Sequence, residues 1–178
     1  MRHHIIVMSD YLDSKNYDGL REYLDNYSDS LPDKQTFSFC SHRTINSILL
    51  HYAQKSVEHK IDFQVQLSLP DKIGVSDTDI SVLLGNLLEN ALQACIEYNG
   101  KRKIKVCGES TLHSLSFTID NTCENEIKMN KQGEFLTTKE NGSGLGIKSV
   151  KHIVKQHRGV FHAEKKGNMF YASFMLNY

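Results

Sequence analysis

The hydrophobic residues at the start of the chain recur at the three- and four-residue spacing of amphipathic helices. They are Ile5, Ile6, Met8, Tyr11 and Leu12, followed by Leu20, Tyr23, Leu24 and Tyr27. Asn16 or Asp18 could cap the second helix, and Pro32 breaks the pattern after it. We therefore predict a helical hairpin over residues 1–35. A hairpin of this size buries too little to be stable without a second copy or the domain that follows.

From residue 36 the pattern switches between helical and strand periodicity, which predicts an α/β domain over residues 36–178. Helices are expected at about 43–59, 76–98 and 145–156, and strands at about 61–69, 103–107, 112–120, 159–164 and 168–176. Gly108-Glu109-Ser110 is expected to separate the second and third strands, and Lys165-Lys166-Gly167 the last two. Residues 121–142 have little periodicity, and a loop of that length in a compact domain is usually functional.

The composition is that of an ordinary globular protein, with 39% hydrophobic and 24% charged residues. Lys+Arg and Asp+Glu both number 21, and without a basic excess we expect no binding to nucleic acid. Apolar runs fall far short of the roughly 20 residues that span a bilayer, and the first residues lack the layout of a signal peptide, so we expect no membrane contact. Cys40, Cys95, Cys107 and Cys123 are widely spread, which indicates reduced thiols in a cytoplasmic protein.

A stripe of polar side chains interrupts the apolar helix expected at 76–98. Asn86, Glu89, Asn90 and Gln93 follow one another at spacings of three and four, so they share one side of the helix. These side chains could hold a hydrated Mg²⁺ ion and the phosphates that it bridges, because Mg²⁺ takes few protein oxygens and completes its shell with water and phosphate. The solvated face of an amphipathic helix has the same spacing, and spacing alone favours that plainer interpretation.

A glycine-rich segment, Gly142-Ser143-Gly144-Leu145-Gly146, leads directly into the helix expected after it. Glycines let the backbone approach an anion, and the free amides at a helix start favour negative charge, so phosphate binding is one interpretation. A flexible loop that enters a helix is the other. The segment matches neither a P-loop nor a dinucleotide-binding fingerprint.

Two further groups of residues could contact a nucleotide. Thr137-Thr138-Lys139 could supply two hydroxyls and an ammonium group to a phosphate chain, although ordinary loop residues would look the same. Asp120 and Asn121 end the third predicted strand, where a side-chain oxygen could accept a hydrogen bond from the exocyclic amine of adenine. A turn-forming Asp-Asn pair explains these two residues equally well.

The order of these features resembles the ATP-binding fold of the GHKL family, which includes histidine kinases and gyrase. Residues 85–94 (GNLLENALQA) are similar to the N box of that family, and residues 142–146 to its second glycine box. The resemblance covers about residues 40–178. It implies an α/β sandwich in which helices cover one face of a mixed, mainly antiparallel sheet of about five strands, with ATP bound between the helices and the loop 121–142, which would act as a lid.

The resemblance also implies roles for single residues. Asn90 would be the Mg²⁺ ligand and Asn86 a group that positions a phosphate or a water, with Glu89 and Gln93 beside them. Thr122 and Glu124 stand where glycines of the first glycine box are expected, which leaves open whether Asp120 or Asn121 contacts adenine. These roles come from the family and not from spacing.

Thr137-Thr138-Lys139 ahead of the glycine box, and Ile61-Asp62-Phe63 leading to Leu69-Pro70, are similar to the peptide-sensing histidine kinases of Gram-positive bacteria. That branch implies a homodimer with a membrane-anchored parent, in which the γ-phosphate of ATP passes to a histidine on the dimerisation helix and then to an aspartate of a response regulator. The acceptor is either His3 or a histidine upstream of Met1. A serine kinase of the anti-sigma type and a non-catalytic nucleotide-binding or dimerisation module remain alternatives.

Overall fold

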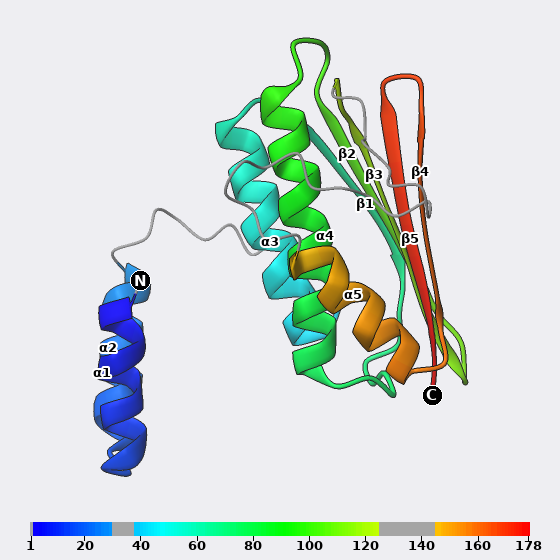
Figure 1. Ribbon diagram of the computed structural model, residues 1–178. Helices are drawn as coiled ribbons and strands as arrows, with labels where there is room; N and C mark the ends of the chain where they lie inside the picture. Colours follow the sequence, from blue (N-terminus) through cyan, green and yellow to red (C-terminus); the bar gives the residue numbers. More distant parts are fainter. Residues whose placement is uncertain (1, 30–37, 125–144) are drawn as a thin grey trace. The chain divides into compact units, whose positions relative to one another are not determined.

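The computed structural model describes residues 2–29, 38–124 and 145–178, and the chain divides into two units, Met1–Phe37 and Ser38–Tyr178 (Figure 1). The first unit is the helix pair α1 (Arg2–Asp13) and α2 (Tyr17–Asp29). Asn16 caps α2, because its Oδ1 accepts a hydrogen bond from the Gly19 amide at 3.0 Å. Ile5 and Ile6 are 62% and 64% exposed, so α1 keeps apolar side chains on its surface.

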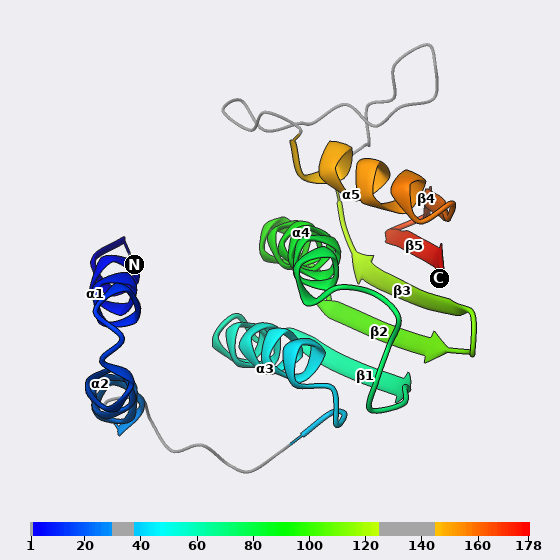
Figure 2. The ribbon, with the colours of Figure 1, turned by 90° about the horizontal axis from the view of Figure 1, so that it is seen from below.

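The second unit is one five-stranded sheet with three helices over one face (Figures 1 and 2). The strands are β1 (Asp62–Ser68), β2 (Lys103–Ser110), β3 (Ser114–Thr122), β4 (Val160–Lys166) and β5 (Met169–Asn177). They lie in the order β1-β2-β3-β5-β4; β1 is parallel to β2, and the other pairs are antiparallel. The helices are α3 (Arg43–Glu58), α4 (Asp77–Glu97) and α5 (Leu145–Gln156). The predicted mixed sheet covered on one face is confirmed.

Alternation along the strands places the core on the helix-covered face of the sheet. In β3 the side chains of Leu115, Phe117 and Ile119 are at most 1% exposed, whereas Thr118 between them is exposed. Helix α4 lies between α3 and α5 above this face (Figure 2), and its buried residues are spread from Ile80 to Cys95. The N-box sequence is therefore carried by the central helix of the domain.

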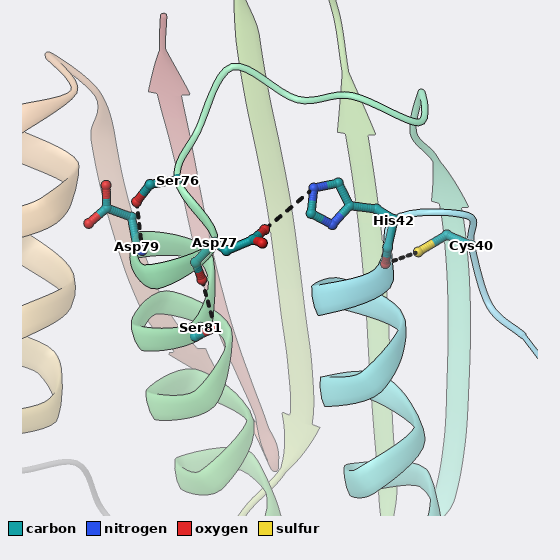
Figure 3. Close-up of polar contacts among 6 residues, drawn as sticks. All are labelled: Cys40, His42, Ser76, Asp77, Asp79 and Ser81. Carbon is teal, nitrogen blue, oxygen red and sulfur yellow. Dashed lines mark hydrogen bonds and ion pairs between the residues drawn. The ribbon is translucent and has the colours of Figure 1, made fainter. Parts of the chain in front are cut away.

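The first turn of α4 makes polar contacts with residues that flank both neighbouring helices, and Figure 3 shows the contact on the α3 side. Ser76 caps α4 by accepting a hydrogen bond from the Asp79 amide at 3.1 Å. The Asp79 carboxylate lies 3.1 Å from Nε2 of His157, just after α5, and the Asp77 carboxylate lies 3.8 Å from Nε2 of His42, just before α3. Two acidic residues in this turn also complement the helix dipole.

The predicted break at Gly108-Glu109-Ser110 is wrong, because these residues belong to β2 and the turn to β3 lies at residues 111–113. Gly108 faces the core, where an added Cβ would lie 2.5 Å from Phe117 and 2.7 Å from Leu67. The glycine thus makes room for an aromatic ring, and it was mistaken for a turn signal. The last hairpin turns at Gly167 and Asn168, with Gly167 in the left-handed region at φ +59°.

Candidate nucleotide-binding site

Asn86 of α4 lies against the start of α5. Its Nδ2 donates a hydrogen bond to the Val82 carbonyl at 2.7 Å, which fixes the orientation of the amide. Its Oδ1 then faces Gly146, where an added Cβ would lie only 2.7 Å from that oxygen. The structure therefore brings together one residue of the N-box sequence and the last residue of the glycine-rich segment.

Asn90 lies one turn further along α4 and is half-buried. Its side chain has no hydrogen-bond partner within the described part of the chain, in contrast to Asn86. A half-buried amide without a protein partner leaves an oxygen available to a ligand or a cation. This oxygen suits Mg²⁺, which prefers oxygen ligands and keeps several of its waters.

Glu89 faces the other side of α4, towards α3. The Tyr52 hydroxyl donates hydrogen bonds to Glu89 Oε2 at 3.3 Å and to the Gly85 carbonyl at 3.1 Å. Lys55 Nζ lies 3.9 Å from the same carboxylate, and Gln93 Nε2 donates to its other oxygen at 3.5 Å. Burial, with the Glu89 carboxylate beside it, raises the pKa of Tyr52. Glu89 and Gln93 thus belong to a network that joins α4 to α3.

Tyr52 did not stand out in the sequence, although it contacts the N-box helix twice. It is 8% exposed and lies among the buried residues of α3, which share one face of that helix. The available signal was that a tyrosine on an apolar helix face needs a partner for its hydroxyl. Which partner it finds depends on how α3 packs against α4.

Asn121, at the end of β3, faces the helix-covered side of the sheet. It is 1% exposed and alternates in phase with Phe117 and Ile119 of the core. Its Nδ2 donates to the Thr122 carbonyl at 3.0 Å, which leaves Oδ1 as an acceptor. The Cys95 thiol of α4 donates to the same carbonyl at 3.4 Å, so this end of β3 lies beneath α4.

Asp120 projects from the opposite face of the sheet, which none of α3, α4 and α5 covers (Figure 2). Its cross-strand neighbours there are Lys105 of β2 and Tyr171 of β5. Partial burial raises the pKa of Asp120, and Lys105 opposes this shift. The structure therefore does not bring Asp120 together with the polar side chains of α4.

Several predicted site residues lie outside the described residues. Thr137, Thr138, Lys139, Gly142, Ser143 and Gly144 are among them. The side chains of Leu145, which begins α5, and His3, which lies in α1, are also outside the described part. The site that can be described thus consists of α4, the end of β3 and the start of α5.

Comparison with known proteins identifies the family of this domain. The family model for the GHKL domain matches residues 75–177, and the chain belongs to this family. The match includes α4, the end of β3 and the start of α5, which carry the candidate site.

Two curated relatives are histidine kinases by name. Sporulation kinase A of Bacillus subtilis (strain 168) is 36% identical over 95 residues, which cover 50% of this chain and 15% of that protein. Sensory histidine kinase/phosphatase NtrB of Azospirillum brasilense is 30% identical over 151 residues, which cover 72% of this chain and 38% of that protein. The chain therefore spans well under half the length of these relatives.

Solved structures share the fold at low sequence identity. The catalytic domain of histidine kinase ThkA matches with a TM-score of 0.62 at 23% identity, covering 76% of this chain and 92% of that one. Full-length ShkA in complex with AMPPNP matches with a TM-score of 0.59 at 13% identity, covering 81% of this chain and 31% of that one. Within the described residues, no helix has the length and apolar character needed to cross a membrane.

Proposed function

We propose that this GHKL domain binds Mg·ATP and transfers the γ-phosphate to a histidine side chain. The contact between Asn86 and Gly146 carries the proposal, because it joins the N-box helix to the glycine-rich segment at one place. The free amides at the start of α5 would face the phosphates, and Asn90 would supply an oxygen to Mg²⁺. The structure of ShkA, which shares this fold, contains the ATP analogue AMPPNP.

Adenine would be recognised by Asn121 and not by Asp120. Asn121 lies on the same side of the sheet as α4, and its Oδ1 can accept a hydrogen bond from the exocyclic amine of the base. An amide at position 86 cannot remove a proton from water, so Asn86 would position a phosphate and would not act as a general base. This property suits transfer to a protein side chain better than hydrolysis.

The acceptor would be a histidine of a dimerisation helix in a homodimer, with His3 as the candidate within this sequence. The phosphate would then pass to an aspartate of a response regulator in the cytoplasm. The names of the two curated relatives support a histidine kinase. The similarity of Thr137-Thr138-Lys139 and Ile61-Asp62-Phe63 to peptide-sensing kinases supports that branch, with a membrane-anchored parent.

Titration of the chain with an ATP analogue, with and without Mg²⁺, tests the binding step. We expect binding that requires Mg²⁺ and is weakened about 10-fold or more by Asn90→Ala, the loss typical of one interaction with a charged ligand. Gln66→Ala is the control, because Gln66 is exposed on β1. Failure of the wild type to bind at millimolar concentrations of the analogue would reject the catalytic function and leave an interaction module.

The chemistry of the transferred phosphate tests the second step. After incubation with ATP labelled at the γ-phosphate, phosphohistidine is labile in acid and stable in base, whereas phosphoserine is stable in acid. If His3 is the acceptor, we expect acid-labile label that His3→Ala removes and His4→Ala retains. Acid-stable label would instead indicate the serine kinase.

A further inference from the structure

An open groove of about 420 Å³ lies between α5 and strand β4, at the end of α5 opposite to Gly146. Its lining residues are Lys151, Val154, Lys155, Arg158, Gly159 and Phe161. The lining therefore combines apolar and basic side chains and includes no acidic side chain. The candidate nucleotide site uses none of these residues.

The charge of this region differs from that of the chain as a whole. Residues 145–163 contain Lys148, Lys151, Lys155 and Arg158 but no aspartate or glutamate, whereas the whole chain has equal numbers of acidic and basic residues. Within the described part of the chain, neither Lys155 nor Arg158 forms an ion pair. Such a local excess of one sign attracts and orients a partner of the opposite sign.

The groove runs along an open edge of the sheet. Strand β4 is the last strand in the sheet order, and no other described segment pairs with its outer edge (Figure 1). Phe161 of β4 lines the groove, whereas Val160 before it is 60% exposed on the opposite face of the sheet. An edge strand presents a row of backbone donors and acceptors to which an extended peptide can add.

We propose that this groove binds an acidic, extended segment of a partner protein, which adds to β4 as a further strand. Backbone hydrogen bonds to β4 hold the segment, while Lys151, Lys155 and Arg158 contact its carboxylates. Apolar side chains of the segment pack on Val154 and Phe161. The groove thereby gives the domain an interaction surface separate from its nucleotide site.

The probe is a fluorescent peptide of about eight residues, the length of an ordinary strand. It carries valine and glutamate in turn at every other position, with threonine between them, so that both kinds of side chain face the groove. Its binding to the full chain is followed by anisotropy. Lys155→Glu and Arg158→Gly each reduce the affinity by about 10-fold, as expected for loss of a contact with a carboxylate. Arg158→Gly is compatible with the backbone, because Arg158 has φ +49° and glycine adopts this conformation readily. Lys101→Glu, at a second groove formed by residues near β1 and the end of α4, is the matched control and leaves the affinity unchanged.

Two versions of the peptide, each N-methylated at alternate residues, test for strand addition. The version whose methyl groups face β4 does not bind, whereas the other version binds like the parent peptide. The proposal is overturned if both versions bind equally, or if lysine in place of glutamate leaves binding unchanged. It is also overturned if the chain does not bind the acidic peptide but binds short duplex DNA or anionic lipid vesicles, and if substitution of Lys155 or Arg158 weakens that binding.

Discussion

The proposed role of Asn121 follows from the different partners of the two polar atoms in its side-chain amide. Nδ2 is engaged with the Thr122 carbonyl at 3.0 Å, so the remaining oxygen can only accept. Adenine offers a donor at its exocyclic amine, whereas guanine has a carbonyl oxygen at that position. A site built around one hydrogen bond rejects a ligand that leaves the buried group unpaired.

We therefore expect Asn121→Ala to abolish the preference for ATP over GTP, and Asp120→Ala to leave it intact. Competition between the two nucleotides measures the preference as a ratio, which a general loss of folded protein does not change. Asn121→Asp keeps an acceptor and should keep part of the preference. An unchanged ratio in Asn121→Ala together with a loss in Asp120→Ala would transfer adenine recognition to the other face of the sheet.

Gly146 is required by the position of Asn86. A methyl group at residue 146 would meet Asn86 Oδ1 at 2.7 Å, and the bond from Nδ2 to Val82 holds that amide in place. We expect Gly146→Ala to lower the affinity for the ATP analogue about 10-fold while the fold persists. Calorimetric titration measures this loss. If the variant binds with the affinity of the wild type, the contact between Asn86 and Gly146 does not contribute to nucleotide binding.

Gly85 in α4 provides the matched comparison. No atom lies within 4 Å of an added Cβ there, and Tyr52 contacts only the backbone carbonyl of this residue. Gly85→Ala should therefore raise the free energy of unfolding by about 0.5–1 kcal/mol, the gain expected for alanine in a helix interior. Nucleotide affinity should not change in this variant.

Single residues were predicted with uneven success, for physical reasons. The face of Asn121 could have been read from its alternation with Phe117 and Ile119, because strand periodicity alone decides the side of a sheet. The direction of the Glu89 side chain could not be read in this way, since the polar stripe on α4 is wide enough to face both α3 and the candidate nucleotide site. Only the packing of Tyr52 against α4 separates these two directions.

At the scale of elements, the first turn of α4 is a junction between three helices. The Asp79 carboxylate there accepts a hydrogen bond from His157, and this contact lowers the pKa of Asp79. Because the folded pKa lies below the unfolded value of about 3.9, the ionised carboxylate stabilises the fold fully above that pH. The contribution is lost as the pH falls through the folded pKa.

We expect the stability difference between wild type and Asp79→Asn to be constant near pH 5 and to shrink towards about pH 3. Urea unfolding at each pH measures it. Asp77→Asn is the control, because the Asp77 side chain is 69% exposed at 3.8 Å from His42, and exposed pairs of this kind contribute little. A difference that grows in acid would mean that His157 does not stabilise the charged form of Asp79.

Elements were easier to predict than the turns between them. Helix α4 was recognisable from its long apolar pattern, and it begins just after Ser76, close to the start predicted at about residue 76. The predicted position of the turn after β2 was wrong, because glycine occurs both in turns and where a side chain packs closely against the backbone. Gly108 lies opposite Phe117, and that contact arises only once β2 and β3 have paired.

At the scale of the whole molecule, the second unit has a complete core of its own. Among the residues whose side chains the structure describes, every member of the buried hydrophobic cluster lies between Ile45 and Leu176. The sheet and the three helices bury their apolar faces against one another within residues 38–178. The candidate nucleotide site also lies within this unit, so we expect residues 38–178 to fold and to bind without the helix pair.

A fragment of residues 38–178 should consequently melt at the same temperature as the full chain and bind the ATP analogue with the same affinity. A fragment that begins at residue 61 is the control. It lacks α3, whose Ile45 and Leu49 are fully buried and contribute about 1.5–3 kcal/mol each, so it should fail to fold. Thermal unfolding followed by circular dichroism distinguishes these outcomes. A melting temperature lower by more than about 4 °C in the 38–178 fragment, equivalent to about 1 kcal/mol, would show that the helix pair stabilises the domain. In that case the exposed Ile5 and Ile6 would be the first residues to test for the contact, because a stabilising helix pair must bury apolar surface.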